Sequence, residues 1–312
     1  MIPAYKLRLF AIAIAISISA LAQAEKTDAC PRDDKDFAAI QQRADANDPA
    51  AQIALASCYD LGMHVKPDGK ESIRWITKAA NQGYAPAEYE LGRIYLYGRG
   101  INTDYAQALI WERKAAEKGD PRAQRDLAFM YERGLGVNHD AAQVAALNRK
   151  AAEKGDARAQ LRLAQALENG DGIAKDENEA ELWYIKAGMQ KLPEAQLGLA
   201  RIYAKKNPLP CQKAIEWYGR AAKSGEAQAM YEVGKLYLDK KCATDGPGDS
   251  TAYMWFSLGG RFGSSQSRLN AELLSSALKP AQKRNADLAI ERWMKEYTAE
   301  QKKENEEEEE ER

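Results

Sequence analysis

Almost the same ten-residue phrase occurs twice in this chain, 36 residues apart. The first copy is AAEKGDPRAQ at residues 115–124 and the second is AAEKGDARAQ at residues 151–160, so the copies differ at one letter. A phrase repeated at a fixed period is typical of repeat proteins, in which each unit is one supersecondary motif that buries its apolar face against its neighbours. We therefore expect a fold built from units of about this length.

Four columns of residues keep this period over about residues 44–260, which predicts six units. They are an alanine (Ala79, Ala115, Ala151, Ala187, Ala221), a tryptophan (Trp75, Trp111, Leu147, Trp183, Trp217, Trp255), a tyrosine (Tyr59, Tyr95, Tyr131, Leu167, Tyr203, Tyr237) and a second alanine (Ala51, Ala87, Ala123, Ala159, Ala195, Ala229).

Each unit is predicted to hold two helices. In the third unit Gly119 ends the preceding helix, Asp120 caps the next one and Pro121 fits its first turn. The segment after Pro121 has apolar residues at helical spacing, and it ends at a glycine-rich turn. An aspartate stands before the second helix of four units: Asp68, Asp104, Asp140 and Asp176.

In these repeated residues the chain resembles the Sel1-like repeat proteins, relatives of the tetratricopeptide repeats. The stretch AANQGYAPAEYELGRIYLYGRGINTDYAQALIWERK (79–114) matches the pattern of that family nearly throughout. The resemblance implies an all-α fold: a right-handed superhelical α-solenoid of six helix-turn-helix repeats with capping helices at both ends. The last two units, with AKKNPLPCQKA and LDKKCATDGPGDSTA, lose the double-glycine loop and should have loops of another shape.

The expected domain organisation has five parts. A signal peptide (1–24) and an N-terminal capping segment (25–43) precede the repeat solenoid (44–263), whose units are about 44–78, 79–114, 115–150, 151–186, 187–220 and 221–263. Capping helices (264–300), broken near Pro280 with Leu288, Ile290 and Trp293 facing inward, and a disordered acidic tail (301–312) complete the chain.

The first residues have the composition of a secretory signal. Lys6 and Arg8 precede an apolar run from Leu9 to Leu21, and Ala22-Gln23-Ala24 provides small residues for cleavage after Ala24. We expect a periplasmic or secreted bacterial protein without stable membrane insertion after cleavage, because no later apolar run is long enough to span a bilayer.

Secretion changes the expectation for the four cysteines, Cys30, Cys58, Cys211 and Cys242. In an oxidising compartment an even set usually pairs, and three pairings are possible. Proximity in the sequence favours Cys30–Cys58 and Cys211–Cys242.

Catalytic and cofactor motifs are not evident. The two histidines, His64 and His139, fall in loops of different repeats and are interpreted as polar loop residues, and no His or Cys pair has metal-ligand spacing. The spacing of the carboxylates does not identify a catalytic acid/base pair. The formal net charge of −1 argues against nucleic-acid binding. The sequence therefore predicts no enzyme, no cofactor and no metal.

A binding surface is predicted on the face of each first helix that lies opposite the stripe of buried columns. In the family architecture, this face lines the concave groove. It carries aromatic and basic residues, the types most frequent at interface hot spots; a solvated face with scattered apolar residues is the plainer interpretation. The predicted groove residues are Tyr89, Arg93, Tyr97, Arg125, Phe129, Arg133, Arg201, Lys205, Tyr231 and Lys235.

The acidic tail ENEEEEEER (304–312) carries seven glutamates and one arginine. A run of like charge is normally disordered and solvated. A second hypothesis is that this tail competes with the partner for the basic groove.

The expected function is that of a monomeric, non-enzymatic scaffold, adaptor or regulator that binds a protein or peptide of the cell envelope. Two alternatives stay open. A cysteine-rich branch of the resembled family binds or hydrolyses β-lactams, but its members carry a cysteine pair in nearly every repeat and this chain has four cysteines in all. The groove aromatics could also stack on the sugars of peptidoglycan or another glycan.

Overall fold

The computed structural model describes residues 29–206, 208–239, 242 and 248–311, and it is helical with no strand in these ranges. The expected signal peptide lies outside them. The helices are α2 (Asp34–Asp45), α3 (Pro49–Leu61), α4 (Gly69–Asn81), α5 (Ala85–Tyr97), α6 (Tyr105–Glu117), α7 (Pro121–Arg133), α8 (Ala141–Glu153), α9 (Ala157–Asn169), α10 (Glu177–Met189), α11 (Pro193–Lys205), α12 (Cys211–Lys223), α13 (Ala227–Leu238), α14 (Gly248–Arg261), α15 (Ser265–Ala277) and α16 (Pro280–Glu311).

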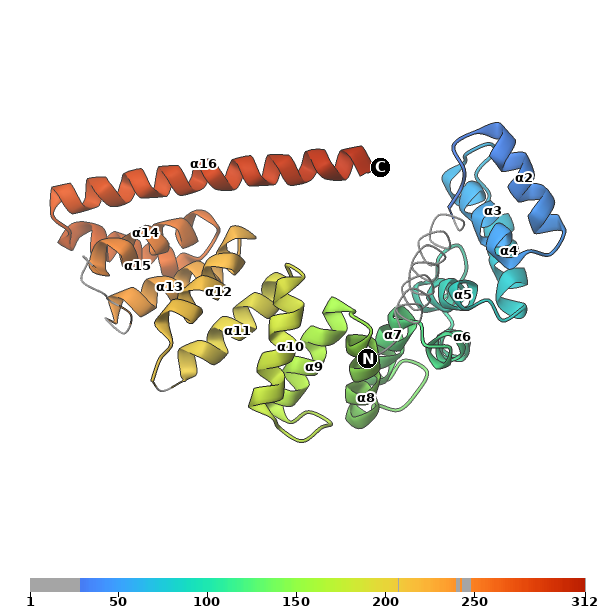
Figure 1. Cartoon of the computed structure of the whole chain (residues 1–312), viewed down its shortest axis with the longest axis horizontal. Coiled ribbons are helices and arrows are strands. Elements are labelled where there is room, and N and C mark those ends of the chain that lie inside the picture. The colour runs from blue at the N-terminus through green and yellow to red at the C-terminus, as the bar shows by residue number, and fades with distance from the viewer. Residues whose placement is uncertain (1–28, 207, 240–241, 243–247, 312) are drawn as a thin grey trace, which may run out of the picture. The chain divides into compact units, whose positions relative to one another are not determined.

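The helices form two compact units. Unit 1 runs to Ala159 and includes Asp171–Ile173, and unit 2 consists of Gln160–Gly170 and the chain from Ala174 onward. Within each unit, consecutive helices pack side by side as an α-solenoid (Figure 1). None of the described helices combines the length and apolarity needed to cross a membrane.

The repeated phrase places one turn between two helices. The glycine of the phrase adopts a positive φ at Gly119 (+89°) and Gly155 (+96°), a conformation that favours glycine because it lacks a Cβ. The next residue, Asp120, accepts hydrogen bonds from the backbone N–H groups of Arg122 (2.8 Å) and Ala123 (3.3 Å) and thereby caps α7. The predicted caps at Asp68, Asp104, Asp140 and Asp176 are confirmed.

Two other residues of the phrase make hydrogen bonds, one to the turn of the preceding repeat and one across its own turn. Lys118 donates to the carbonyl of Gly83, 35 residues earlier (2.6 Å), and Lys154 donates in the same way to the carbonyl of Gly119. Gln124 donates back across its own turn to the carbonyl of Ala116 (3.1 Å). The lysine and the glutamine of the phrase therefore make contacts that recur in other repeats.

The tryptophan column fills the space between the helices of a repeat, and a basic residue three positions later covers the ring. The Nζ of Lys78, Lys114 and Lys186 lies 3.8–3.9 Å from the ring centroids of Trp75, Trp111 and Trp183, and Arg220 covers Trp217. The basic side chains cover these large rings near the surface, while their own charged groups stay in water.

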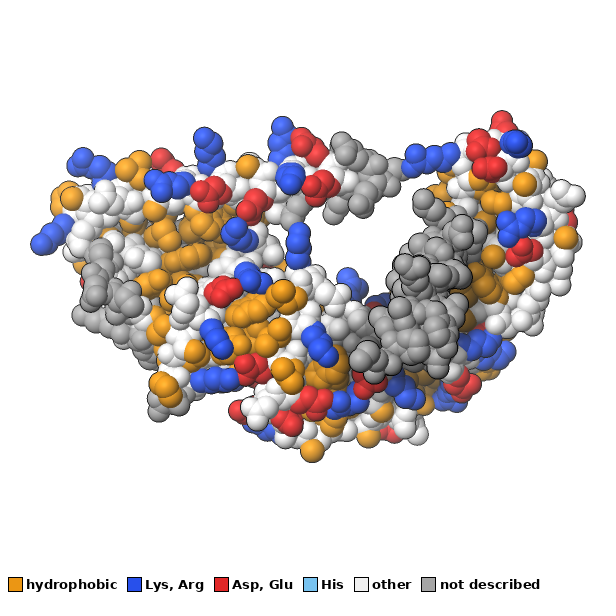
Figure 2. All heavy atoms as spheres, in the orientation of Figure 1, with side chains coloured by type: hydrophobic (Ala, Val, Ile, Leu, Met, Phe, Trp, Pro, Cys, Tyr) orange, Lys and Arg blue, Asp and Glu red, His pale blue; other side chains and the backbone are white. Residues whose placement is uncertain are grey.

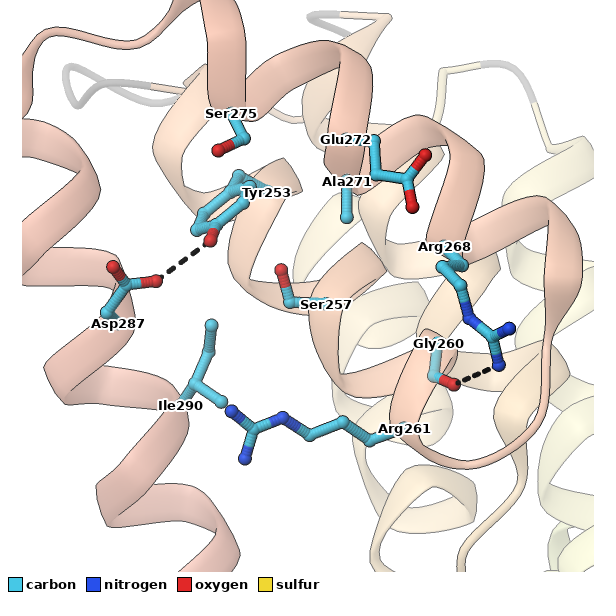
Figure 3. A pocket seen from close by; sticks show the side chains of 10 residues that line it. All are labelled: Tyr253, Ser257, Gly260, Arg261, Arg268, Ala271, Glu272, Ser275, Asp287 and Ile290. Carbon is cyan, nitrogen blue, oxygen red and sulfur yellow. Dashed lines mark hydrogen bonds between the residues drawn. The ribbon is translucent and has the colours of Figure 1, made fainter.

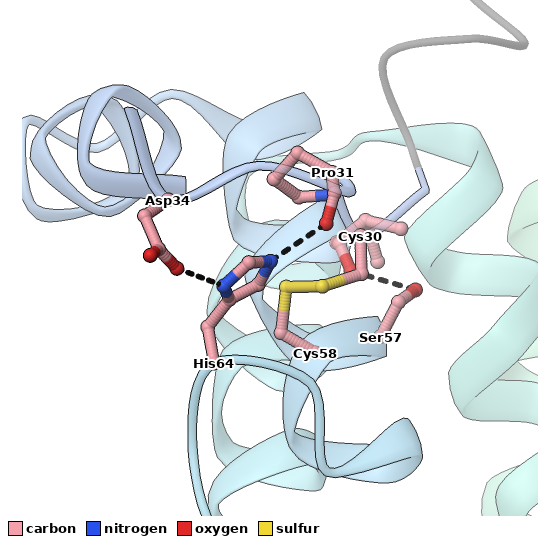
Figure 4. Close-up of a disulfide and its surroundings, with 7 residues drawn as sticks. Cys30, Pro31, Asp34, Ser57, Cys58 and His64 are labelled. Carbon is pink, nitrogen blue, oxygen red and sulfur yellow. Dashed lines mark hydrogen bonds and ion pairs between the residues drawn. A yellow bond between two sulfur atoms is a disulfide. The ribbon is translucent and has the colours of Figure 1, made fainter. Parts of the chain in front are cut away.

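Both favoured disulfides are present. Cys30–Cys58 ties the N-terminal segment to α3 (Figure 4), and Cys211–Cys242 ties the start of α12 to the segment after α13. The second bond joins the two segments in which the sequence loses the double-glycine loop. A covalent bond there restricts loops whose backbone no longer follows the repeat pattern.

The two ends of the chain depart from the two-helix repeat. The expected N-terminal helix is α2, and the predicted break near Pro280 separates α15 from α16. Ile290 is buried as expected, whereas Leu288 is 55% exposed, so its inward placement was wrong.

The acidic tail also differs from the expectation, because α16 continues as a helix through Glu311. Lys302 and Lys303 lie 3.5 Å from Glu306 and Glu307, one helical turn later. Such pairs, in a stretch of strong helix formers, favour the helical state.

Candidate partner-binding surface

The first helices of two successive repeats, α5 and α7, carry six of the predicted groove residues in unit 1. On α5 these residues are Tyr89, Arg93 and Tyr97, and on α7 they are Arg125, Phe129 and Arg133; each set has four-residue spacing. This spacing places each set along one side of its helix. We call these six residues the α5/α7 surface.

Arginine side chains lie over the aromatic rings of this surface. The guanidinium of Arg93 is 5.6 Å from the ring centroid of Tyr89 and 5.7 Å from that of Tyr97. Arg99 is 5.9 Å from the Tyr97 ring, and Arg133 is 5.8 Å from the Phe129 ring. Because Tyr97 is 52% exposed, the outer part of the surface is an accessible aromatic ring close to two guanidinium groups.

Tyr89 does not belong to the accessible part. It is only 3% exposed, since the neighbouring α7 covers it: the Arg122 guanidinium lies 4.5 Å from its ring centroid. Burial, together with the charge of Asp126, raises the pKa of the Tyr89 hydroxyl. Tyr89 therefore joins two repeats and supports the α5/α7 surface from below.

Several carboxylates lie beside the α5/α7 surface, although none of the predicted groove residues of α5 and α7 is acidic. Arg125 pairs with Asp156 (2.5 Å) and Asp126 (3.4 Å), and Arg93 lies 3.9 Å from Glu90. Asp156 belongs to the next turn along the chain, so its position cannot be read from the columns of α5 and α7. Arg99 and Arg133 make no ion pair among the described residues and carry the positive charge that remains available to a partner.

Glu112 is a feature of this region that the sequence analysis missed. It lies on α6, is 0% exposed, and neither of its carboxylate oxygens has a hydrogen-bond partner in the described part of the chain. Burial, together with the nearby charge of Asp126, raises the pKa of Glu112 to about 10. The group is therefore neutral at pH 7.

The sequence contains a signal for Glu112 at the position that follows the tryptophan column. The residue after the tryptophan position is apolar or aromatic in four other repeats: Ile76, Tyr184, Tyr218 and Phe256. Glu112 occupies this buried position beside Gly92, where a Cβ would lie 2.8 Å from Glu112 Oε1. The chain thus places a carboxylic acid where other repeats place an apolar or aromatic side chain.

The other four predicted groove residues lie in unit 2. Lys205 is exposed and donates to Glu168 (3.2 Å), and Arg201 is exposed on the same helix, α11. On α13, Tyr231 packs against Phe256, and Lys235 lies over the Tyr231 ring at 5.7 Å. Within unit 2 these residues form two small groups, each on one helix.

The histidines and acidic groups form no metal site: within the described ranges, no set of three His, Cys, Asp or Glu side chains could hold an ion. His64 is more than a polar loop residue. Its Nδ1 lies 2.7 Å from Asp34 Oδ1, its Nε2 lies 2.8 Å from the carbonyl oxygen of Pro31, and its ring stacks on Phe37 (Figure 4). His64 therefore fastens the N-terminal segment and α2 beside the Cys30–Cys58 disulfide.

Comparison with known proteins identifies the repeat. The Sel1 repeat family model matches six times, at residues 49–84, 85–120, 121–156, 157–192, 193–226 and 227–259. These matches begin at the first helix of each pair, whereas the expected units are divided within the second helix, before the last turn of that helix. No curated protein matches the chain.

Two solved structures are similar over much of the chain. One, a protective antigen of uropathogenic Escherichia coli with an SLR fold, is 31% identical over 85% of this chain, with a TM-score of 0.71; the chain covers 56% of its length. The other, a Sel1 repeat protein from Oxalobacter formigenes, is 32% identical over 68% of this chain and 85% of its own, with a TM-score of 0.56. The family matches cover most of the chain, which therefore belongs to the Sel1 repeat family.

Proposed function

We propose that this protein is a non-catalytic scaffold of the bacterial periplasm or secreted space that binds a protein or peptide through its α5/α7 surface. Proteins built from Sel1 repeats are in general protein-interaction scaffolds, and the two disulfides are compatible with an oxidising compartment. The observation that carries the proposal is the exposed Tyr97 ring, with the guanidinium groups of Arg93 and Arg99 within 6 Å of its centroid.

This arrangement favours binding for two reasons. An aromatic ring supplies a large contact area with few rotatable bonds, and arginine supplies planar donors, so both are frequent at binding hot spots. The ring and the guanidinium groups are also held by α5 and α7, which pack against α6, so little order has to be gained on binding.

The test places a photocrosslinking amino acid at Tyr97 in living cells. The matched control is the same substitution at Tyr105, which is also an exposed tyrosine of unit 1 (41%) but lies on α6. We expect a discrete protein adduct at position 97 that is absent at position 105. Equal adducts at the two positions, or none at position 97, would contradict the proposal.

A charge reversal shows whether such an adduct depends on the surface. Arg93→Glu combined with Arg133→Glu should abolish the adduct at position 97 and leave the helix content unchanged. The control pair is Lys150→Glu with Arg158→Glu, two exposed cations on α8 and α9 that should change neither property. Persistence of the adduct in the first pair would show that the arginines are not part of the interface.

A further inference from the structure

A cavity of about 470 Å³ opens at the C-terminal end of unit 2, among α14, α15 and α16 (Figure 3). Tyr253, Ser257 and Arg261 line it from α14, Ser275 lines it from α15, and Asp287 lines it from α16. Its volume falls within the range of small-molecule sites, about 300–1,000 Å³. The α5/α7 surface belongs to unit 1, so this cavity is a separate candidate.

The cavity exists because α16 packs along α14 rather than continuing the stack on α15. Four rings hold α16 there: Trp293 contacts Trp255 and Phe262, and Tyr297 contacts Phe262 and stacks on Trp293. Figure 2 shows the hydrophobic side chains gathered beneath this helix. The α16 wall of the cavity is therefore fixed by a core of its own.

The opposite wall is fixed as well. Gly260 of α14 allows α15 to approach so closely that a Cβ at this position would lie 3.2 Å from the Cα of Arg268. Between the two walls, the short side chains of Ser257 and Ser275 leave the space open. The cavity is thus preformed, which reduces the ordering that a ligand would have to impose.

Some of the polar groups around the cavity already have partners. Asp287 accepts hydrogen bonds from the Tyr253 hydroxyl (2.8 Å) and from Lys283 (2.8 Å). Arg268 donates to the carbonyl of Gly260 (3.4 Å) and forms no ion pair with Glu272, although the two are one helical turn apart. These contacts leave Asp287 and Arg268 with limited capacity for a ligand.

Four lining groups make no hydrogen bond or ion pair among the described residues: the Arg261 guanidinium, the Glu272 carboxylate and the hydroxyls of Ser257 and Ser275. In Figure 3, Arg261 reaches toward α16 on one side of the cavity and Glu272 projects from α15 on the other, with Ser257 between them. The cavity therefore presents one charge of each sign without an ion-pair partner, on either side of the Ser257 hydroxyl, and the charge of Arg261 also acts on the nearby carboxylate of Asp287.

We propose that this cavity binds a short zwitterionic peptide, with the α-carboxylate at Arg261, the α-ammonium at Glu272 and the peptide groups at Ser257 and Ser275. A simple anion would satisfy Arg261 and be repelled by Glu272, and a simple cation would meet the converse problem. A guanidinium group binds a carboxylate through two parallel hydrogen bonds, which gives this end of the site its direction.

The first experiment measures binding of trialanine to the purified protein by titration calorimetry at low salt, beside N-acetyl-trialanine and trialanine amide. Each capped peptide lacks one terminal charge, and we expect each to bind at least about tenfold more weakly than trialanine, as the loss of one charged hydrogen bond predicts. Equal binding of the three peptides, or no binding of trialanine at about 10 mM, would overturn the proposal.

Variants assign the two ends. Arg261→Gln should weaken trialanine binding by about tenfold but leave the affinity for the amide unchanged, because the amide already lacks the carboxylate. Glu272→Gln should act in the same way toward the acetylated peptide. The controls, Arg284→Gln and Glu291→Gln, change exposed residues of α16 outside the lining and should bind trialanine like the unaltered protein.

A third variant tests whether trialanine binds in this cavity, without a change of charge. Ser275→Leu fills the cavity from the α15 side and should abolish binding while the helix content, measured by circular dichroism, stays the same. If a folded Ser275→Leu variant binds trialanine normally, or if the charge variants show no preference between the peptides, trialanine binds elsewhere and the proposed site is wrong.

Discussion

At the scale of single residues, Glu112 is the clearest departure from the repeat pattern. It stands where Tyr184, Tyr218 and Phe256 stand in other repeats, and it is as deeply buried as they are. A buried carboxyl without hydrogen-bond partners avoids the cost of a buried charge by keeping its proton. The position is therefore tolerated because the group is neutral.

Because the buried Glu112 keeps its proton, the stability of the folded protein should depend on pH. The pKa of Glu112 is raised by burial from 4.5 to about 10 in the folded protein, so between these values the unfolded chain releases a proton that the folded chain retains. The free energy of unfolding should then fall by up to about 1.4 kcal/mol per pH unit above the lower value. Glu112→Gln should remove this decline.

Chemical denaturation of both proteins between pH 4 and pH 8 checks this prediction. The two should be similarly stable at pH 4, and the variant should be the more stable at pH 8. Glu117→Gln, a change of an exposed glutamate on the same helix, should leave the pH dependence of the original protein intact. If Glu112→Gln keeps the same decline, Glu112 is ionised in the folded state.

At the scale of elements, α2 is held by contacts that differ from those of the repeats. The Cys30–Cys58 disulfide fixes the segment before α2, and His64 connects that segment to the loop after α3. Both ring nitrogens of His64 face acceptors, the carbonyl of Pro31 and the carboxylate of Asp34. Two donated hydrogen bonds require the doubly protonated imidazolium ring.

The attachment of α2 should therefore weaken as the pH rises. The bond to the Pro31 carbonyl and the carboxylate of Asp34 raise the pKa of His64 above 6.5, so its stabilisation is complete below that value and is lost as the pH passes the raised pKa. Hydrogen exchange in α2, corrected for intrinsic rates, should be faster at pH 8 than at pH 6. His64→Gln should abolish this difference and His139→Gln should retain it; a difference that survives His64→Gln would refute the role of His64.

At the scale of the whole molecule, the contacts that hold the fold are local in sequence. Within each unit, consecutive helices pack on each other, and hydrogen bonds such as that of Lys118 to Gly83 reach back one repeat. In such a repeat array each unit is stabilised by its own contacts and those of its neighbours. Damage to one repeat should therefore spread only a short distance.

Ala123→Leu tests this locality. Ala123 is 0% exposed at a repeat interface of unit 1, and overpacking of such a site typically costs about 1–3 kcal/mol. Hydrogen exchange should accelerate in α5 to α8, while α14 and α16 should keep the protection that they have in the unaltered protein. An equal loss of protection along the whole chain would show that the molecule unfolds as a single cooperative unit.

The sequence by itself determined the repeat, because the residues that form its turns, caps and helix contacts act locally. Gly119 forms the turn, Asp120 caps the helix that follows, and Ala123 packs where the helices meet; each role follows from backbone geometry or side-chain size. The cysteine pairing could be anticipated for the same reason, since both bonds join segments about one repeat apart.

Only the tertiary structure decided which of the outward columns are accessible and which charges are paired. Helical spacing places Tyr89 and Tyr97 on the same side of α5 and predicts that both are accessible. In the structure, α7 covers Tyr89 and leaves Tyr97 exposed. Arg125 meets Asp156 from another turn, and α16 packs on α14 instead of α15, which opens a cavity that no column indicates. Burial and ion pairing depend on residues that are distant in the sequence, so a periodic pattern can predict the scaffold but cannot predict its sites.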